Sequence, residues 1–125
     1  LITVESLISD PAADPHSYES TPADAATVAG GDIVVHNGGG YDEFMPQLLD
    51  AAGGDPVVIE VAELSGLVPA EEEGEHAGEE HAEGEEHGHG EFNEHFWYSL
   101  PTVQALAQRL AEDLGAADAA NAATY

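Results

Sequence analysis

Histidines occur in two kinds of sequence in this chain, and both kinds could bind a metal ion. Four of the seven lie in a 21-residue tract, residues 71–91, that contains only Glu, His, Gly and Ala. These four are His76, His81, His87 and His89. The other three, His16, His36 and His95, lie in sequence of ordinary composition. Because neutral imidazole binds zinc well and carboxylates can complete such a site, the histidines predict metal handling.

The composition of the Glu/His tract (residues 71–91) indicates weak binding of several metal ions rather than one tight metal site. Its histidines are separated by 5, 6 and 2 residues, unlike the regular spacing of a structural zinc site. Its composition cannot bury an apolar core, so we predict a mobile loop over residues 66–92. Flexible His and Glu bind divalent cations weakly, and neighbouring carboxylates favour protonated His. The four histidines are therefore candidate accessory ligands, and a merely solvated acidic linker is the alternative.

His16 lies in the segment Asp14-Pro15-His16-Ser17-Tyr18-Glu19, where a proline stiffens the backbone just before the imidazole. Such a loop histidine suits a zinc ligand, although an ordinary surface residue is the alternative. His36 ends an apolar run, and we expect it to pack or to support ligands from behind rather than to bind metal.

His95 lies in the segment Asn93-Glu94-His95-Phe96-Trp97-Tyr98. Three aromatic residues beside a histidine would form a dry and rigid surround, which strengthens metal ligation. The alternative is a histidine that is simply packed against core aromatics. His95 is thus the second candidate ligand.

The chain is strongly acidic along its whole length. It has 26 Asp and Glu residues against a single base, Arg109, and only 10 of the acids lie in the Glu/His tract. Binding to nucleic acid or to anionic membrane is excluded as a main function, because both need Lys or Arg against phosphate. Cations are the natural partners, and solubility or adaptation to salt is the plain alternative.

Other compositional features narrow the class of protein. The chain has 125 residues, which suits one domain, and no cysteine, so metal ligands must be His or carboxylate. No apolar run is long enough to span a membrane, and we do not expect a signal peptide in the chain, which opens with a strand-like run at Leu1.

Strands and helices are expected to alternate along the chain. We predict strands at residues 2–8, 32–36 and 56–61 from their apolar and β-branched character. We predict helices at residues 22–29, 42–52 and about 103–114, the last one stopped by Gly115. Thr21, Pro22 and Asp24 form a helix-start signal. Residues 118–125 are expected to begin another helix.

This alternation predicts an α/β fold of parallel βαβ units. Ligands bind such sheets at the carboxyl ends of the strands. The loops after the three expected strands contain His16, His36 and the Glu/His tract, so we expect them to open on the same edge of the sheet.

Four motifs in order carry a resemblance over essentially the whole chain. They are the segment at residues 14–19, Asn37-Gly38-Gly39-Gly40-Tyr41, the Glu/His tract, and Glu94-His95-Phe96-Trp97-Tyr98. Together they resemble the ZnuA-like solute-binding proteins of bacterial zinc ABC importers. The resemblance implies a three-layer Rossmann-like lobe with a parallel sheet and flanking helices, similar to the N-terminal lobe of a two-lobe metal-binding receptor.

The resemblance also implies which residues act. His16 and His95 correspond to the two metal ligands of the N-terminal lobe. Beside this match, we interpret His36, Tyr18 and Glu94 as candidate supporting residues. Zinc is expected in preference to manganese, because a His-rich loop is typical of the zinc branch. Residues 1–125 would form part of the N-terminal lobe, with residues 116–125 starting the interlobe helix. A C-terminal lobe beyond Tyr125 is expected to complete the metal site.

The implied function is extracytoplasmic capture of zinc and its delivery to the permease of an ABC importer. The location is the periplasm or the cell surface, where a lipid anchor preceding Leu1 is one alternative. A zinc buffer that acts mainly through the Glu/His tract is the alternative function. An enzyme is not expected, because no H-E-x-x-H pattern or Ser-His-Asp set is suggested by the sequence.

Overall fold

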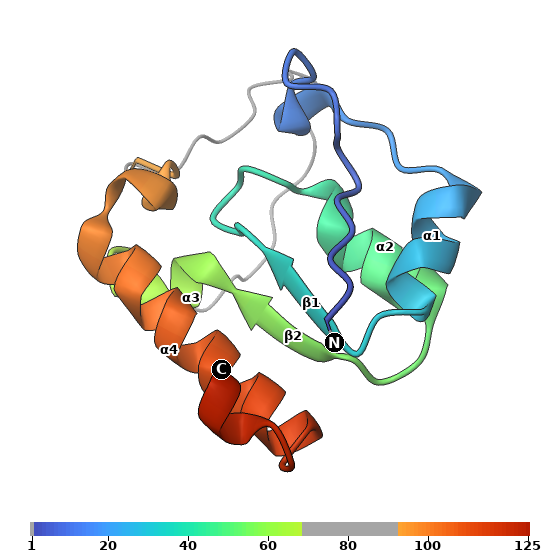
Figure 1. Cartoon of the computed structure of the whole chain (residues 1–125). Coiled ribbons are helices and arrows are strands. Elements are labelled where there is room, and N and C mark those ends of the chain that lie inside the picture. Colours follow the sequence, from blue (N-terminus) through green and yellow to red (C-terminus); the bar gives the residue numbers. More distant parts are fainter. Residues whose placement is uncertain (1, 69–92) are drawn as a thin grey trace, which may run out of the picture.

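A pair of parallel strands forms the centre of the fold. The computed structural model describes residues 2–68 and 93–125, and in them β1 (Ile33–His36) pairs with β2 (Val57–Glu60). Ile33 lies opposite Val57, and His36 lies opposite Glu60. Helices α1 (Pro22–Ala29) and α2 (Phe44–Ala52) lie on one side of the strands and α4 (Leu100–Ala117) lies on the other (Figure 1). The predicted α/β class, with a parallel sheet and flanking helices as in a Rossmann-like lobe, is confirmed.

Helix α1 begins where the sequence predicts. The Thr21 hydroxyl accepts a hydrogen bond from the backbone N–H of Asp24 at 3.3 Å, and the Asp24 carboxylate accepts the N–H of Thr21 at 2.7 Å. This reciprocal cap satisfies two N–H groups that have no partner within the helix. The helix then packs on α2 through Val28, which is buried with Met45 and Leu48.

A second buried cluster lies on the other side of the sheet. Val61 and Ala62 of a short helix, α3 (Val61–Ser65), pack with Phe96 and Leu106. Helix α3 is absent from the sequence prediction, which extended the strand to Val61. The strand ends one residue earlier because the chain turns there, and the N–H of Ala62 donates to the Asn37 carbonyl at 2.8 Å.

The predicted strand at residues 2–8 is wrong. The sheet of the described residues contains only β1 and β2, and the first segment runs as an extended trace without strand pairing (Figure 1). Leu7 packs against the α1–α2 cluster, whereas Val4 is 87% exposed. A β-branched pattern indicates that a segment can be extended, but a strand also requires a neighbour for its backbone hydrogen bonds.

The sequence predicts that the last helix stops at Gly115, but helix α4 continues to Ala117. A Cβ atom on Gly115 would lie 3.3 Å from Cβ of Ala122, so this glycine allows the chain to fold back closely onto the helix. Residues 118–125 form turns and the short 3-10 helix η3 (Ala122–Thr124) rather than a new α-helix. Their role at the start of an interlobe helix stays a prediction.

Among the described residues, no helix is long and apolar enough to cross a membrane.

Candidate metal-binding site

His16 is held by the aspartate two residues before it. It lies in the 3-10 helix η1 (Pro15–Ser17), where Asp14 Oδ1 accepts the backbone N–H of His16 at 3.1 Å. The same oxygen lies 2.9 Å from Nδ1 of the imidazole. A carboxylate oxygen can only accept here, so Nδ1 carries a proton and the ring orientation is set.

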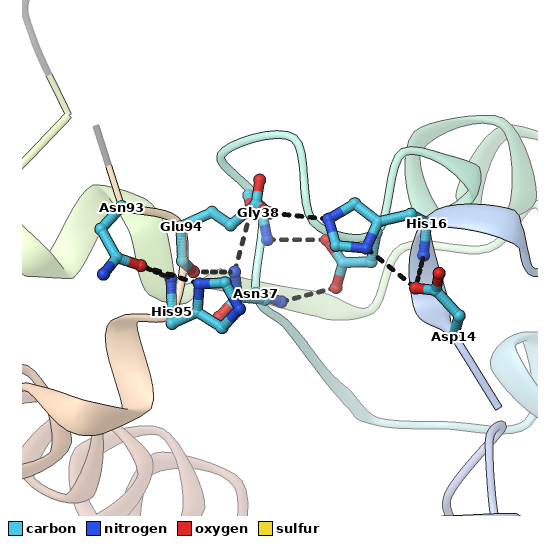
Figure 2. Close-up of polar contacts among 8 residues, drawn as sticks. Asp14, His16, Asn37, Gly38, Asn93, Glu94 and His95 are labelled. Carbon is cyan, nitrogen blue, oxygen red and sulfur yellow. Dashed lines mark hydrogen bonds and ion pairs between the residues drawn. The ribbon is translucent and has the colours of Figure 1, made fainter. Parts of the chain in front are cut away.

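The other nitrogen of His16 reaches across the molecule. Nε2 lies 2.6 Å from Oε1 of Glu94, which is 78 residues away in the sequence (Figure 2). The hydrogen bonds to Asp14 and then to Glu94 raise the pKa of the His16 imidazole, and His16 in turn lowers the pKa of Asp14. Both nitrogens thus face carboxylates, an arrangement that suits the protonated ring. A metal ion at Nε2 would have to replace that proton.

His95 is held by the same local device. Asn93 Oδ1 accepts the backbone N–H of His95 at 3.0 Å and lies 2.7 Å from its Nδ1 (Figure 2). The amide oxygen is an acceptor only, so Nδ1 carries a proton, and in the neutral ring Nε2 carries the lone pair. Among residues 2–68 and 93–125, the hydrogen bond of the His95 ring is made by Nδ1. This is the tautomer that a metal ligand requires.

Tyr41 lies against both histidines. Its ring centroid is 5.0 Å from that of His16 and 5.9 Å from that of His95, in both cases edge to face. The ring also packs on Trp97 at 4.7 Å, and Trp97 packs on His95 at 5.0 Å. Burial, followed by the negative charges of Asp14, Asp42 and Glu94, raises the pKa of the Tyr41 hydroxyl. One aromatic ring therefore joins the two candidate ligands.

The glycine loop (residues 37–42) connects this tyrosine to strand β1. Asp42 accepts the N–H of Asn37 and the N–H of Gly38, each at 2.7 Å. Asn37 donates its side-chain amide to the backbone carbonyl of Glu94 at 2.9 Å. Helix α2 begins at Phe44, two residues later than predicted, because Asp42 belongs to this loop. The loop thereby bonds to the residue that precedes His95.

Gly38 must be a glycine in this loop. Its φ is +71°, a conformation that side chains disfavour, and a Cβ atom would overlap the Glu60 side chain. Glu60 lies at the end of β2, so the loop fits closely over both strand ends.

His36 lies beneath the glycine loop. It is only 9% exposed, and its Nδ1 is 3.6 Å from Oδ1 of Asp42. Its Nε2 is 3.9 Å from Oε2 of Glu60. The interaction with Asp42 raises the pKa of the His36 imidazole, although burial opposes the rise. His36 borders a hollow of about 230 Å³, which is lined by His36, Gly38, Gly39, Gly40, Asp42, Glu43, Pro46 and Glu60.

Tyr18 has different neighbours from those of the two candidate ligands. Its hydroxyl donates to Asp24 at 3.0 Å, and its ring packs on Phe44 at 4.9 Å. It fastens the segment after His16 to α1 and α2.

The four histidines of the Glu/His tract lie outside the described residues. Within the described residues, no three acidic, His or Cys side chains are grouped to hold a metal ion.

Sequence reasoning missed several residues that organise this site: Asn37, Tyr41, Asp42 and Asn93. One signal was present in the sequence, because Asp14 and Asn93 each stand two residues before a candidate ligand, where their short side chains can reach a backbone N–H. The contact of His16 with Glu94 has no such local signal.

A known protein family matches the chain from its first residue to its last. Residues 1–125 match the family model described as ZnuA, zinc-uptake complex component A, periplasmic. The match spans both candidate histidines, the glycine loop and the Glu/His tract, in agreement with the order of motifs in the sequence. The chain therefore belongs to the ZnuA family of periplasmic zinc-uptake components.

Proposed function

We propose that this chain captures zinc outside the cytoplasm through His16 and His95 and delivers it to an ABC-type importer. The observation that carries the proposal is the shared geometry of the two histidines. In each, a side chain two residues earlier engages Nδ1, so Nε2 is the nitrogen that we assign to the metal. In His16 a metal ion would have to displace the contact of Nε2 with Glu94. Both rings also lie against Tyr41, although they come from opposite ends of the chain.

Two imidazoles fill half of the tetrahedral shell that zinc prefers. The C-terminal lobe implied by the family resemblance would supply the remaining ligands, with zinc held between the lobes. The tract histidines His76, His81, His87 and His89 would act as accessory collectors. The family assignment supports zinc over manganese as the substrate.

Other residues support the two ligands. Asp14 and Asn93 hold Nδ1 of the two rings, and the Glu94 carboxylate accepts a hydrogen bond from the Nε2–H of His16. Tyr18 anchors the segment that follows His16. His36 supports the glycine loop from beneath, where it lies beside Asp42. Partners of ligating histidines commonly change metal affinity by 10- to 100-fold when they are removed.

The chemistry suits reversible binding rather than catalysis. The formal net charge of −25 attracts cations, and imidazole nitrogens release zinc when protons compete. A transport receptor needs both capture and release, and it needs no bond-making step.

Zinc titration of variants tests this assignment. We expect His16→Ala and His95→Ala each to lower the affinity of the tightest zinc site by at least about 10-fold, measured by competition with a chromophoric chelator. His87→Ala, a change of the same residue type in the Glu/His tract, should leave that affinity within about twofold. Tight binding that survives in both site variants would exclude this pair of ligands.

A further inference from the structure

The glycine loop contacts both halves of the candidate zinc site. Through Tyr41 it touches the rings of His16 and His95, and through Asn37 it bonds to the carbonyl of Glu94. Because these ligands come from segments almost 80 residues apart, their relative position depends on whatever holds the loop in place.

Asp42 holds the loop from within. Its two carboxylate oxygens accept the N–H groups of Asn37 and Gly38, and its side chain is only 12% exposed. Burial, the largest influence, raises the pKa of Asp42, but the nearby His36 imidazole and the hydrogen bonds from the two N–H groups together lower it below the usual value. The carboxylate is therefore charged in the fold, and the charge is compensated locally.

The imidazole of His36 lies beside this carboxylate. Its side chain is only 6% exposed, and Nδ1 has no hydrogen-bond partner within the part of the chain that the structure describes. The nearest carboxylate oxygen to that atom is Oδ1 of Asp42 at 3.6 Å. Glu60 lies 3.9 Å from Nε2, and Glu63 also acts on the ring through its charge. Three carboxylates thus act on one buried imidazole.

We propose that His36 and Asp42 form a positioning pair that fixes the glycine loop and thereby sets the distance between His16 and His95. The pair binds no zinc itself. Asp42 bonds to the backbone of the loop, and His36 anchors Asp42 to the end of β1. The role in zinc affinity rests on the proposed function, whereas the role in loop geometry does not.

Trp97 reports on the loop directly. It is the only tryptophan of the chain, and it packs on both Tyr41 and His95. A shift of the loop should therefore change the near-ultraviolet circular dichroism of Trp97 even in the absence of zinc. A loss of stability alone would leave this signal of the folded protein unchanged.

The first test compares two neighbouring carboxylates in the whole chain. Asp42→Asn removes one acceptor and the charge, whereas Glu43→Gln removes the same charge one residue away, where no side-chain cap bond is formed. We expect Asp42→Asn to alter the metal-free Trp97 signal and to weaken zinc binding by about 10-fold or more. Glu43→Gln should match the parent in both measurements.

The second test uses His36, in case Asp42→Asn does not fold. His36→Phe keeps a ring but removes both nitrogens, whereas His36→Gln keeps an N–H donor for Asp42. We expect the phenylalanine variant to lose the Trp97 signal and zinc affinity, and the glutamine variant to restore most of both.

The outcomes separate this proposal from the assignment of His16 and His95. Suppose that the parent chain binds zinc tightly and that Asp42→Asn and His36→Phe both retain its affinity and its Trp97 signal. The positioning role of His36 and Asp42 is then wrong, and the assignment of His16 and His95 as zinc ligands is unaffected. If the parent binds no zinc but the Trp97 signal changes as expected, the proposed function fails and the pair stands.

Discussion

Nε2 of His16 lies 2.6 Å from Oε1 of Glu94, so the nitrogen proposed to bind zinc is already engaged by a carboxylate from the other end of the chain. The Glu94 side chain is 14% exposed and that of His16 is 32% exposed, which makes the contact partly shielded from water. This bond joins the segment before α1 to the segment before α4.

Replacing Glu94 should change the protonation of His16. In Glu94→Gln the neighbouring negative charge is gone, so we expect the pKa of His16 to fall towards its ordinary value while the Asp14 contact keeps part of the rise. Titration of the ring protons by NMR in the metal-free protein measures this. Glu112→Gln on the exposed face of α4 is the control, and an equal His16 pKa in both variants would contradict the contact.

Removing the partner of Nδ1 in His95 should weaken zinc binding. Asn93→Ala frees the ring and allows the wrong tautomer, so we expect about a 10-fold loss of zinc affinity in a chelator competition. Asn121→Ala is a matched control, because that amide bonds to Asp118 far along the chain. Equal affinities of the two variants would show that Asn93 does not orient the ligand.

Gly38 should tolerate substitution less well than other glycines of positive φ. Gly66 has a φ of +62° and open space around its missing Cβ, so Gly66→Ala should cost only about 1–2 kcal/mol of unfolding free energy. Gly38→Ala adds the overlap with Glu60 and should cost more, measured by urea unfolding. The double variant Gly38→Ala, Glu60→Ala should recover part of the difference. No difference between the single variants would argue against the close fit of the loop.

The contribution of His36 to stability should depend on pH. Its folded-state pKa is raised, so its charge stabilises the fold fully below the unfolded pKa of about 6.5 and this stabilisation is lost as pH rises through the folded pKa. We expect the stability advantage of the parent over His36→Gln to shrink above about pH 6.5. Urea unfolding of both proteins across that range measures it. Repulsion among the many acids is common to both proteins and cancels in the comparison. A stability advantage of the parent that grows with pH would contradict a raised pKa of His36 in the fold.

Deleting residues 71–91 distinguishes the receptor from a zinc buffer. If His16 and His95 form the tight site, the deletion should leave the affinity of that site within about threefold while lowering the total zinc bound at excess metal. Isothermal titration calorimetry gives both quantities. Loss of most binding, including the tightest step, would favour the buffer.

Some parts of this molecule follow from the sequence because they depend on neighbouring residues. The start of α1 needs only Thr21, Pro22 and Asp24, whose side chains and backbone meet within one turn. The apolar runs at β1 and β2 and the parallel α/β class also follow from local pattern. The order of motifs was sufficient to indicate the ZnuA family, which the match over the whole chain confirms.

Other parts were decided only by tertiary structure, because they depend on contacts between distant segments. Residues 2–8 have strand composition but no strand partner in the described fold. Helix α4 runs past Gly115 to Ala117, and Ala122 folds back close to that glycine. Local sequence named His16 and His95, but the approach of Glu94 to His16 and the shared contact with Tyr41 arise only when the glycine loop is in place. The sequence alone thus determined which residues have the chemistry to bind zinc. Folding decided what each ring meets beyond its local partner, since Glu94 and Tyr41 reach the histidines only across the fold.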